Sequence, residues 1–251
     1  MRPLRVLIGC ESSAVVRDAF RALGHDAYSC DLMPCEGDPQ YHFQCDVRTL
    51  LKPGMWDMFI VHPDCTYLTN SAAWAFGDGP YHQSVKPGTL VGAERRAQRE
   101  IALAFVEEML SAPVPYIALE NPAGVIGTRI KPASQYIQPH EYGEDASKKT
   151  GLWLKNLPSL KPTSDYPPRI VEWPIGSGKM VKRWGNQTDS GQNRLSPGAN
   201  RWIERSRTYQ GWADAMANQW GEYIATIVND GDANPAKCEL YIKWAEMENN
   251  Q

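Results

Sequence analysis

The stretch RVLIGCESSAVVRDAF, residues 5–20, sets a short apolar run before a turn of small residues and then a helical pattern. Apolar side chains recur at positions 15, 16, 19, 20 and 23, and Gly24 stands where a helix would end. An apolar run joined to a helix by a tight turn is the start of a βαβ unit. The stretch predicts a strand at Arg5–Ile8, a helix at Ser13–Ala22 and a parallel α/β fold.

The rest of the chain extends this pattern. Further strands are predicted at Asp26–Ser29, Met58–Val61 and Tyr116–Leu119, and a helix at Ala93–Leu110. Prolines and glycines interrupt the chain after Gly151, and helical spacing returns over Thr208–Val228. We expect a Rossmann-like α/β domain in residues 1–150, a small irregular insertion in 151–193, a segment that completes the domain in 194–229, and a tail in 230–251.

Composition and charge limit the class of protein. The 251 residues are 42% hydrophobic and 22% charged, and they contain no apolar run near the roughly 18 residues of a membrane span. The apolar start leads into a helical pattern, so we read it as a strand and not as a signal peptide. The net charge is −3, but residues 146–210 hold 12 Lys and Arg against 4 Asp and Glu, a balance of +8 that suits contact with phosphates.

Six cysteines lack the spacing of a disulfide framework and favour a reducing cytoplasm. Cys30, Cys35, His42 and Cys45 have side chains that zinc accepts, but Cys30 and Cys45 each precede an acid at an expected strand end. We therefore expect no metal.

Polar residues follow the predicted strands, where parallel sheets bind their ligands. The first strand leads into Gly9, Cys10, Glu11 and Ser12, a turn that suits either a ligand or a simple helix cap. Asp31 follows the second strand and could accept hydrogen bonds from ribose hydroxyls, and Asp46 could meet an adenine amino group. The chain has no GxGxxG, and GSGKM at 176–180 is not a phosphate loop.

Two later strands end in reactive groups. Met58–Val61 leads to Cys65, and Tyr116–Leu119 leads to Glu120 and Asn121. A thiolate and a carboxylic acid at one sheet edge suit addition to an electron-poor ring, with the acid serving a ring nitrogen.

Taken in order, these pieces resemble the DNA cytosine-5 methyltransferase family, and especially its short phage and prophage members. The resemblance spans roughly residues 5–225. Its pieces are residues 8–20, Pro63-Asp64-Cys65, Ala118-Leu119-Glu120-Asn121-Pro122, residues 141–150, Arg194-Leu195-Ser196-Pro197 and Ala215-Met216-Ala217-Asn218-Gln219-Trp220.

The resemblance implies a cytoplasmic enzyme of a bacterial host that transfers a methyl group from S-adenosylmethionine to C5 of cytosine in DNA. Cys65 would add to C6 and Glu120 would engage N3 and the 4-amino group. The implied catalytic set is Cys65, Glu120, Asn121, Lys148 and Lys149, and the implied cofactor set is Gly9, Cys10, Glu11, Ser12, Asp31, Asp46, Pro63 and Asn218.

The chain also departs from the family pattern. Cys10, Ser12 and Ala14 stand where the family carries Phe-x-Gly-x-Gly, and Asp64 would raise the pKa of the neighbouring thiol unless its side chain points away. Residues 151–193 are much shorter than the family's target-recognition region, so sequence readout should be weak or short, and duplex DNA, single strands or a cytosine nucleotide all stay open as substrates.

Other readings stay open as well. Transfer of another group to C5 would keep the chemistry of Cys65, whereas an amino methyltransferase would keep its activity without that thiol. A pseudo-enzyme that only binds nucleic acid would modify no base. The long segment from Tyr67 to Gly92 should close over the site, where Trp74, Tyr81 and His82 either stack on a base or pack in the core.

Overall fold

A computed structural model describes residues 2–81, 85, 87–195 and 206–231. Its centre is a seven-stranded sheet in the order β3-β2-β1-β4-β5-β7-β6. The strands are β1 Arg5–Gly9, β2 Asp26–Asp31, β3 His42–Gln44, β4 Met58–Val61, β5 Tyr116–Pro122, β6 Gln135–Ile137 and β7 Thr150–Lys155. All neighbours from β3 to β5 are parallel, and β7 runs antiparallel to both β5 and β6. The predicted Rossmann-like α/β class is confirmed.

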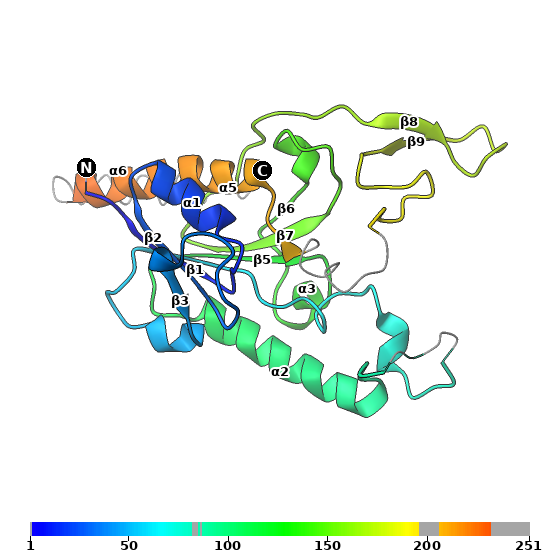
Figure 1. Cartoon of the computed structure of the whole chain (residues 1–251), viewed down its shortest axis with the longest axis horizontal. Coiled ribbons are helices and arrows are strands. Elements are labelled where there is room, and N and C mark those ends of the chain that lie inside the picture. Colours follow the sequence, from blue (N-terminus) through cyan, green and yellow to red (C-terminus); the bar gives the residue numbers. More distant parts are fainter. Residues whose placement is uncertain (1, 82–84, 86, 196–205, 232–251) are drawn as a thin grey trace.

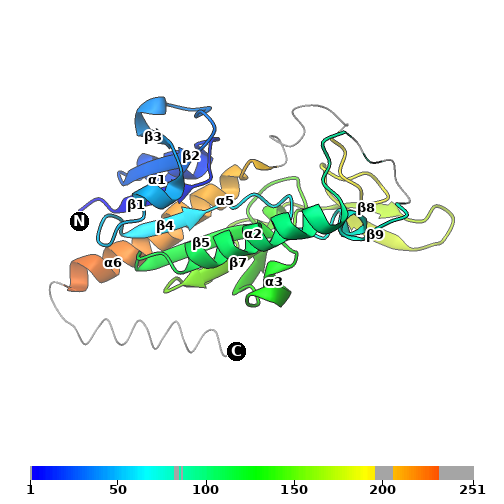
Figure 2. The same ribbon diagram turned by 90° about the horizontal axis from the view of Figure 1, so that it is seen from below.

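Helices cover both faces of the sheet (Figure 1). One face carries α1 Val15–Ala22, α5 Gln210–Ala215 and α6 Gly221–Gly231, with a π-helical turn at Met216–Trp220 between the last two. The other face carries the long α2 Gly92–Leu110 and the short α3 Ile126–Arg129, which Figure 2 shows in front of the strands. The region 208–228, predicted as one helix or a pair of helices, thus contains three consecutive helical pieces.

Side chains that alternate between the two faces of the buried strands form two separate core clusters. In β1, Val6 and Ile8 face α1 and α5, whereas Leu7 faces α2. Because successive side chains of a strand point to opposite faces, a strand covered on both sides must be apolar throughout. This is why RVLI and MFIV carry almost no polar residue, and it explains why these strands were predictable.

The sheet differs from the expectation at β5, which runs on to Pro122 instead of ending at Leu119. Residues Glu120, Asn121 and Pro122 stay extended because they pair with Leu152, Gly151 and Thr150 of β7. Glu120 and Asn121 are therefore held by a ladder and do not lie in a loop.

A second, two-stranded sheet lies outside the main one. It consists of β8 Arg169–Glu172 and β9 Met180–Arg183, paired antiparallel, and it projects from the domain in Figure 1. Strand β7, residues 150–155, belongs to the main sheet. The segment that carries β8 and β9 therefore begins after Lys155 and not at residue 151. The tail beyond residue 231 lies outside the described residues. No helix among the described residues combines the length and the apolar composition that crossing a membrane requires.

Candidate active site

A cavity of about 1270 Å³ opens at the carboxyl ends of β1, β2, β4 and β5. Its wall is completed by residues 147–149 before β7, by seven residues between Gly185 and Leu195 after β9, and by residues 206–209 before α5. Of the thirteen residues predicted for catalysis and cofactor binding, ten line it: Cys10, Glu11, Ser12, Asp31, Pro63, Cys65, Glu120, Asn121, Lys148 and Lys149.

The turn after β1 has an unusual backbone. Cys10 (φ 57°) and Ala14 (φ 66°) both adopt the left-handed conformation that favours glycine. Non-glycine residues in this region cost of order 1–3 kcal/mol each and cluster at functional sites. The turn therefore takes a glycine-like shape without glycine at either position. Burial, followed by the charges of Asp31, Asp46 and Asp64, raises the pKa of the Cys10 thiol to about 12, which favours its protonated form at neutral pH.

The Glu11 carboxylate is hydrogen-bonded to the first turn of α1. It accepts hydrogen bonds from the backbone N–H of Val16 at 2.8 Å and of Arg17 at 3.3 Å, at the start of α1. Burial raises its pKa, and the residue is only 4% exposed. Glu11 therefore lines the cavity while its carboxylate caps the start of α1.

Asp31 ends β2 at the cavity, where its Oδ1 accepts a hydrogen bond from Met33 N–H at 2.9 Å. Ser12 accepts a hydrogen bond from the Glu36 N–H through its carbonyl, at 2.8 Å. Both residues line the cavity.

Three predicted cofactor residues do not line the cavity. Gly9 is inside β1, where an added Cβ would lie 2.9 Å from the side chains of Phe59 and Val47, so close packing explains this glycine. Asp46 is exposed and pairs with Arg48 at 3.0 Å. Asn218 is exposed, and its amide donates to the Asp214 carbonyl at 2.8 Å. The helical face that Asn218 occupies is decided by packing of the whole helix, which the motif alone does not reveal.

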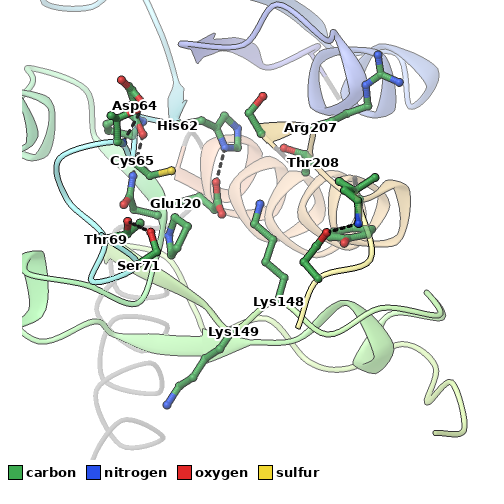
Figure 3. Close-up of a pocket in the computed structure, with 18 of the residues that line it drawn as sticks. His62, Asp64, Cys65, Thr69, Ser71, Glu120, Lys148, Lys149, Arg207 and Thr208 are labelled. Carbon is green, nitrogen blue, oxygen red and sulfur yellow. Dashed lines mark hydrogen bonds and ion pairs between the residues drawn. The ribbon is translucent and has the colours of Figure 1, made fainter. Parts of the chain in front are cut away.

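The loop after β4 presents Cys65 in a tight turn. The Cys65 carbonyl accepts hydrogen bonds from the N–H groups of Leu68 and Thr69 at 3.0 and 3.1 Å. Asn121 holds the same loop to β5, since its amide donates to the Pro63 carbonyl at 2.7 Å. Figure 3 shows the Cys65 sulfur directed toward Glu120.

Asp64, the residue beside the thiol, points away from the cavity centre (Figure 3). Its Oδ1 accepts hydrogen bonds from the Thr66 N–H at 2.9 Å and the Thr66 hydroxyl at 2.7 Å. The carboxylate is thus exposed and held by its own turn.

Glu120 forms a buried pair with His62. His62 Nδ1 and Glu120 Oε2 lie 3.0 Å apart, with side chains only 10% and 8% exposed. Burial alone would raise the pKa of Glu120, but the charge of Lys148 and the hydrogen bond with His62 outweigh it and hold that pKa below its ordinary value. The Thr150 hydroxyl, at the start of β7, donates its hydrogen bond to the Lys148 carbonyl at 3.1 Å.

Three atoms at this end of the cavity are buried and have no hydrogen-bond partner among the described residues. They are His62 Nε2, Glu120 Oε1 and Asn121 Oδ1. A buried polar atom without a partner costs about 1–3 kcal/mol. Three such atoms on one cavity indicate groups that a ligand would satisfy.

The two predicted lysines differ in direction. Figure 3 shows Lys148 reaching toward Glu120 and Lys149 pointing away from it. Lys148 Nζ also lies 5.8 Å from the ring centre of Trp212, and Lys149 Nζ lies 4.4 Å from that of Tyr136. Both residues line the cavity, but only Lys148 acts on the charge of Glu120.

Several cavity residues were not predicted. One is His62, which directly follows β4 and whose backbone N–H donates to the Gly9 carbonyl at 3.0 Å. Arg207 pairs with Glu36, and both line the cavity. The arginine- and hydroxyl-rich run before the last helix was the available signal for Arg207 and Thr208.

The segment after β9 closes another side of the cavity. Asn186 bonds both backbone groups of Ser147, at 2.9 and 3.0 Å, and so ties this segment to the residue before Lys148. Arg194 and Leu195 of the predicted Arg-Leu-Ser-Pro piece line the cavity, whereas Ser196 and Pro197 lie outside the described residues.

The long segment 67–92 contributes residues 69–72 to the cavity. Trp74 and Tyr81 pack edge to face, with ring centres 5.8 Å apart, and neither lines the cavity. His82 lies outside the described residues.

The cysteines considered for zinc do not gather around one point. Cys30 and Cys45 have their sulfurs 3.8 Å apart, but His42 contacts Ser29 and the Met33 carbonyl, and Cys35 contacts Arg17. Within the described ranges, no group of three or more His, Cys, Asp or Glu could hold a metal ion.

Comparison with known proteins gives only distant likenesses. No family model and no curated protein matches the chain. Among solved structures, it is similar to a proposed DNA modification methyltransferase encoded within an E. coli prophage, with 14% identity, 66% of this chain and 52% of that chain covered, and a TM-score of 0.37.

Two further solved structures are similar. A mutant of Spodoptera frugiperda DNMT2 matches with 14% identity over 65% of this chain and 55% of that chain, at a TM-score of 0.33. WbdD in complex with a kinase inhibitor matches with 13% identity over 67% and 39%, at a TM-score of 0.29. The matched part of each covers about half or less of its length, and the fold class rests on the strand order and direction of the sheet itself.

Proposed function

We propose that this protein is an S-adenosylmethionine-dependent methyltransferase that modifies C5 of cytosine in DNA through a covalent adduct with Cys65. The observation that carries the proposal is the convergence of Cys65 and Glu120 on one cavity, with Lys148 beside the carboxylate. A nucleophile, an acid and a cation in this arrangement suit addition to a pyrimidine ring.

The cofactor would bind at the ends of β1 and β2. The fit rests on two features: the left-handed turn at Cys10 and Ala14 lets the backbone approach a ligand closely, and the Asp31 carboxylate stands where ribose hydroxyls can donate to it. Ser12 and Pro63 complete this wall. When bound, S-adenosylmethionine supplies an electrophilic methyl group.

The residues of this chain would divide the chemistry as follows. The Cys65 thiolate forms a bond to C6 of cytosine while Glu120 gives a proton to N3, so that the electron pair of the C5–C6 bond becomes available at C5. Lys148 stabilises negative charge that develops on the ring. After methyl transfer, loss of the C5 proton to a base expels Cys65 as a thiolate, and Glu120 recovers its proton from N3.

DNA would contact the basic part of the chain. The balance of +8 over residues 146–210 includes Lys148 and the β8–β9 hairpin with Lys179, Lys182 and Arg183. Because the reacting carbons of cytosine are inside the base stack of a duplex, the base would have to be flipped out or supplied on a single strand. The short hairpin offers little surface for sequence readout.

The test is mass spectrometry of nucleosides after reaction of purified protein with S-adenosylmethionine and DNA. Duplex DNA, single-stranded DNA and a cytosine nucleotide are separate arms. Wild type should form 5-methylcytosine in a DNA arm, and Cys65→Ala should lower the rate at least about 1000-fold. Cys45→Ser is the matched control, since Cys45 does not line the cavity and should keep near wild-type activity.

An oligonucleotide with 5-fluorocytosine should trap a covalent complex with wild type and none with Cys65→Ala, because fluorine at C5 blocks the elimination. Methylation of a base nitrogen that survives Cys65→Ala would overturn the proposal in favour of an amino methyltransferase. Product in the nucleotide arm alone would overturn DNA as the substrate.

A further inference from the structure

His62 is the buried cavity residue for which the proposed chemistry has no role. It follows β4 directly, and its Nδ1 lies 3.0 Å from Glu120 Oε2. Its backbone N–H donates to the Gly9 carbonyl, which fixes the start of the loop that carries Cys65. The side chain is nine-tenths buried, and Nε2 has no partner among the described residues.

Glu120 needs an outside source for the proton that it gives to cytosine. Lys148 and His62 hold its pKa below the ordinary value, so the carboxyl group is ionised near neutral pH. An ionised carboxylate only accepts hydrogen bonds, which makes His62 Nδ1–H the donor at Oε2. Protonation of N3 therefore requires that a proton first reach Glu120.

The charged groups around His62 come from several elements. Glu11, from the turn after β1, is close enough to interact with it electrostatically, and Glu120 bonds it from β5. Lys148 acts on Glu120 from the segment before β7, and Asp64 and Cys65 follow in the loop of His62 itself. The imidazole is thus the group between two buried carboxylates that can carry a proton on either ring nitrogen.

We propose that His62 is a positioning residue that orients the Glu120 carboxylate and supplies the proton that Glu120 gives to the cytosine ring. This inference rests on the proposed function. The imidazolium gives its Nδ1 proton to Oε2 of the ionised Glu120 carboxylate, and rotation of the carboxyl group then brings this same proton to N3 as Cys65 adds to C6. His62 is then neutral, and the proton returns along the same path when Cys65 leaves.

The number of protons is the same before and after this step. Before addition, the pair holds one proton on Nδ1, and after addition that proton is on N3 of the ring. No proton is drawn from Cys65, which must already be a thiolate. The buried and unpartnered Oε1 is the atom of Glu120 left to face the base, because Oε2 is bound to His62.

The test compares His62→Asn with wild type. Asparagine keeps an N–H donor for Glu120, so positioning is preserved, but it cannot carry an additional proton. We expect kcat to fall about 10- to 100-fold at pH 7.5, the usual range of a lost proton-transfer group, with KM for DNA changed less than about threefold.

The pH dependence separates proton supply from structure. The ratio of kcat in His62→Asn to kcat in wild type should fall as pH rises from 6 to 8, because the variant depends on the direct protonation of Glu120. Ionisation of Cys65 affects both proteins and cancels in this ratio. His140→Asn is the matched control: His140 lies 3.5 Å from Asp165, outside the cavity, and its ratio should not change with pH.

A second measurement does not depend on activity. In protein labelled with ¹⁵N-histidine, the ring signals of His62 are those absent from His62→Asn, and Glu120→Gln should change the chemical shift of the Nδ1 signal, since the carboxylate that accepts its hydrogen bond is removed. A flat kcat ratio, or an unchanged Nδ1 signal in Glu120→Gln, would overturn the relay. Absence of any methylated product with wild type would overturn the proposed function, while the Nδ1 signal would still test the pair.

Discussion

Strand β4 has a charged network at each end, and the two networks differ in how completely their polar atoms are paired. Asp57, just before the strand, is 7% exposed and receives hydrogen bonds from both terminal nitrogens of Arg2 and from the backbone and side chain of Arg5, at 2.7–3.4 Å. Every oxygen of this carboxylate has a partner. This end of the strand is built for stability.

At the other end, His62 and Glu120 are buried to a similar degree, but each keeps an atom without a partner in the described part of the chain. The two ends also differ in what surrounds them, since only the His62 end opens on the cavity. Burial alone therefore does not distinguish the two networks. Unpaired polar atoms that line a cavity do.

The largest expected effect is at the Asp57 end. Asp57→Ala leaves two arginines without their shared acceptor and should lower the free energy of unfolding by about 2–3 kcal/mol. Activity per folded molecule should stay within about twofold of wild type. Urea unfolding followed by circular dichroism measures the first quantity, and methylation assays at 15 °C measure the second.

Asp189→Ala is the control for Asp57→Ala. Asp189 pairs with Arg169 at 3.1 Å, but both side chains are exposed, so its loss should cost at most about 1 kcal/mol. Equal destabilisation by the two variants, or a large loss of activity in Asp57→Ala, would break the proposed division between the ends.

A smaller effect is expected from the lysines near the His62 end. Lys148→Met removes the main charge that lowers the pKa of Glu120, so that pKa should rise. The rate should fall about tenfold, since the cation beside the developing ring charge is lost. Lys149→Met should cost less, because Lys149 points away from Glu120 (Figure 3). Single-turnover methylation rates from pH 6 to 8.5 measure both, and equal losses would contradict the assignment.

The smallest expected effect is the loss of stability at acidic pH that follows from protonation of Asp57. Burial would raise the pKa of Asp57, but the hydrogen bonds from Arg2 and Arg5 hold it far below the ordinary value of 3.8. The stabilisation from Asp57 is therefore fully present above pH 3.8 and is lost as the pH falls toward its native pKa.

Asp57→Asn lacks this dependence. Between pH 4 and 2, the unfolding free energy of wild type should fall more steeply than that of the variant, by at most about 1.4 kcal/mol per pH unit. Parallel curves would show that Asp57 does not titrate differently in the folded and unfolded chain.

Much of the fold and part of the site were predictable from local pattern. The apolar runs of β1, β2, β4 and β5 and the helical spacing of α2 are visible because each element must present apolar side chains to a covered sheet. Ten of the thirteen predicted residues line one cavity. The rule that ligands meet the carboxyl ends of parallel strands pointed to those after β1, β2, β4 and β5, whereas Lys148 and Lys149 were implied only by the family resemblance.

Two predicted cofactor residues make contacts within the fold that their motifs do not reveal. Glu11 was expected to hold a cofactor, but its carboxylate turns back to cap α1, a choice made by the backbone shape of the turn. Asn218 was expected in the pocket, but the π-helical turn and the packing around it leave its side chain exposed. A residue type in a motif does not specify which way its side chain points.

The amino-acid sequence by itself determined the α/β class, the main strands and the nucleophile candidate, because periodicity and strand-end chemistry are properties of neighbouring residues. Only the tertiary structure decided that Glu120 pairs with a histidine 58 positions away, that Asp64 turns from the thiol, and that β7 holds Glu120 in a strand. The partner of a buried polar atom depends on which distant segments pack together, and the local sequence pattern does not specify that packing.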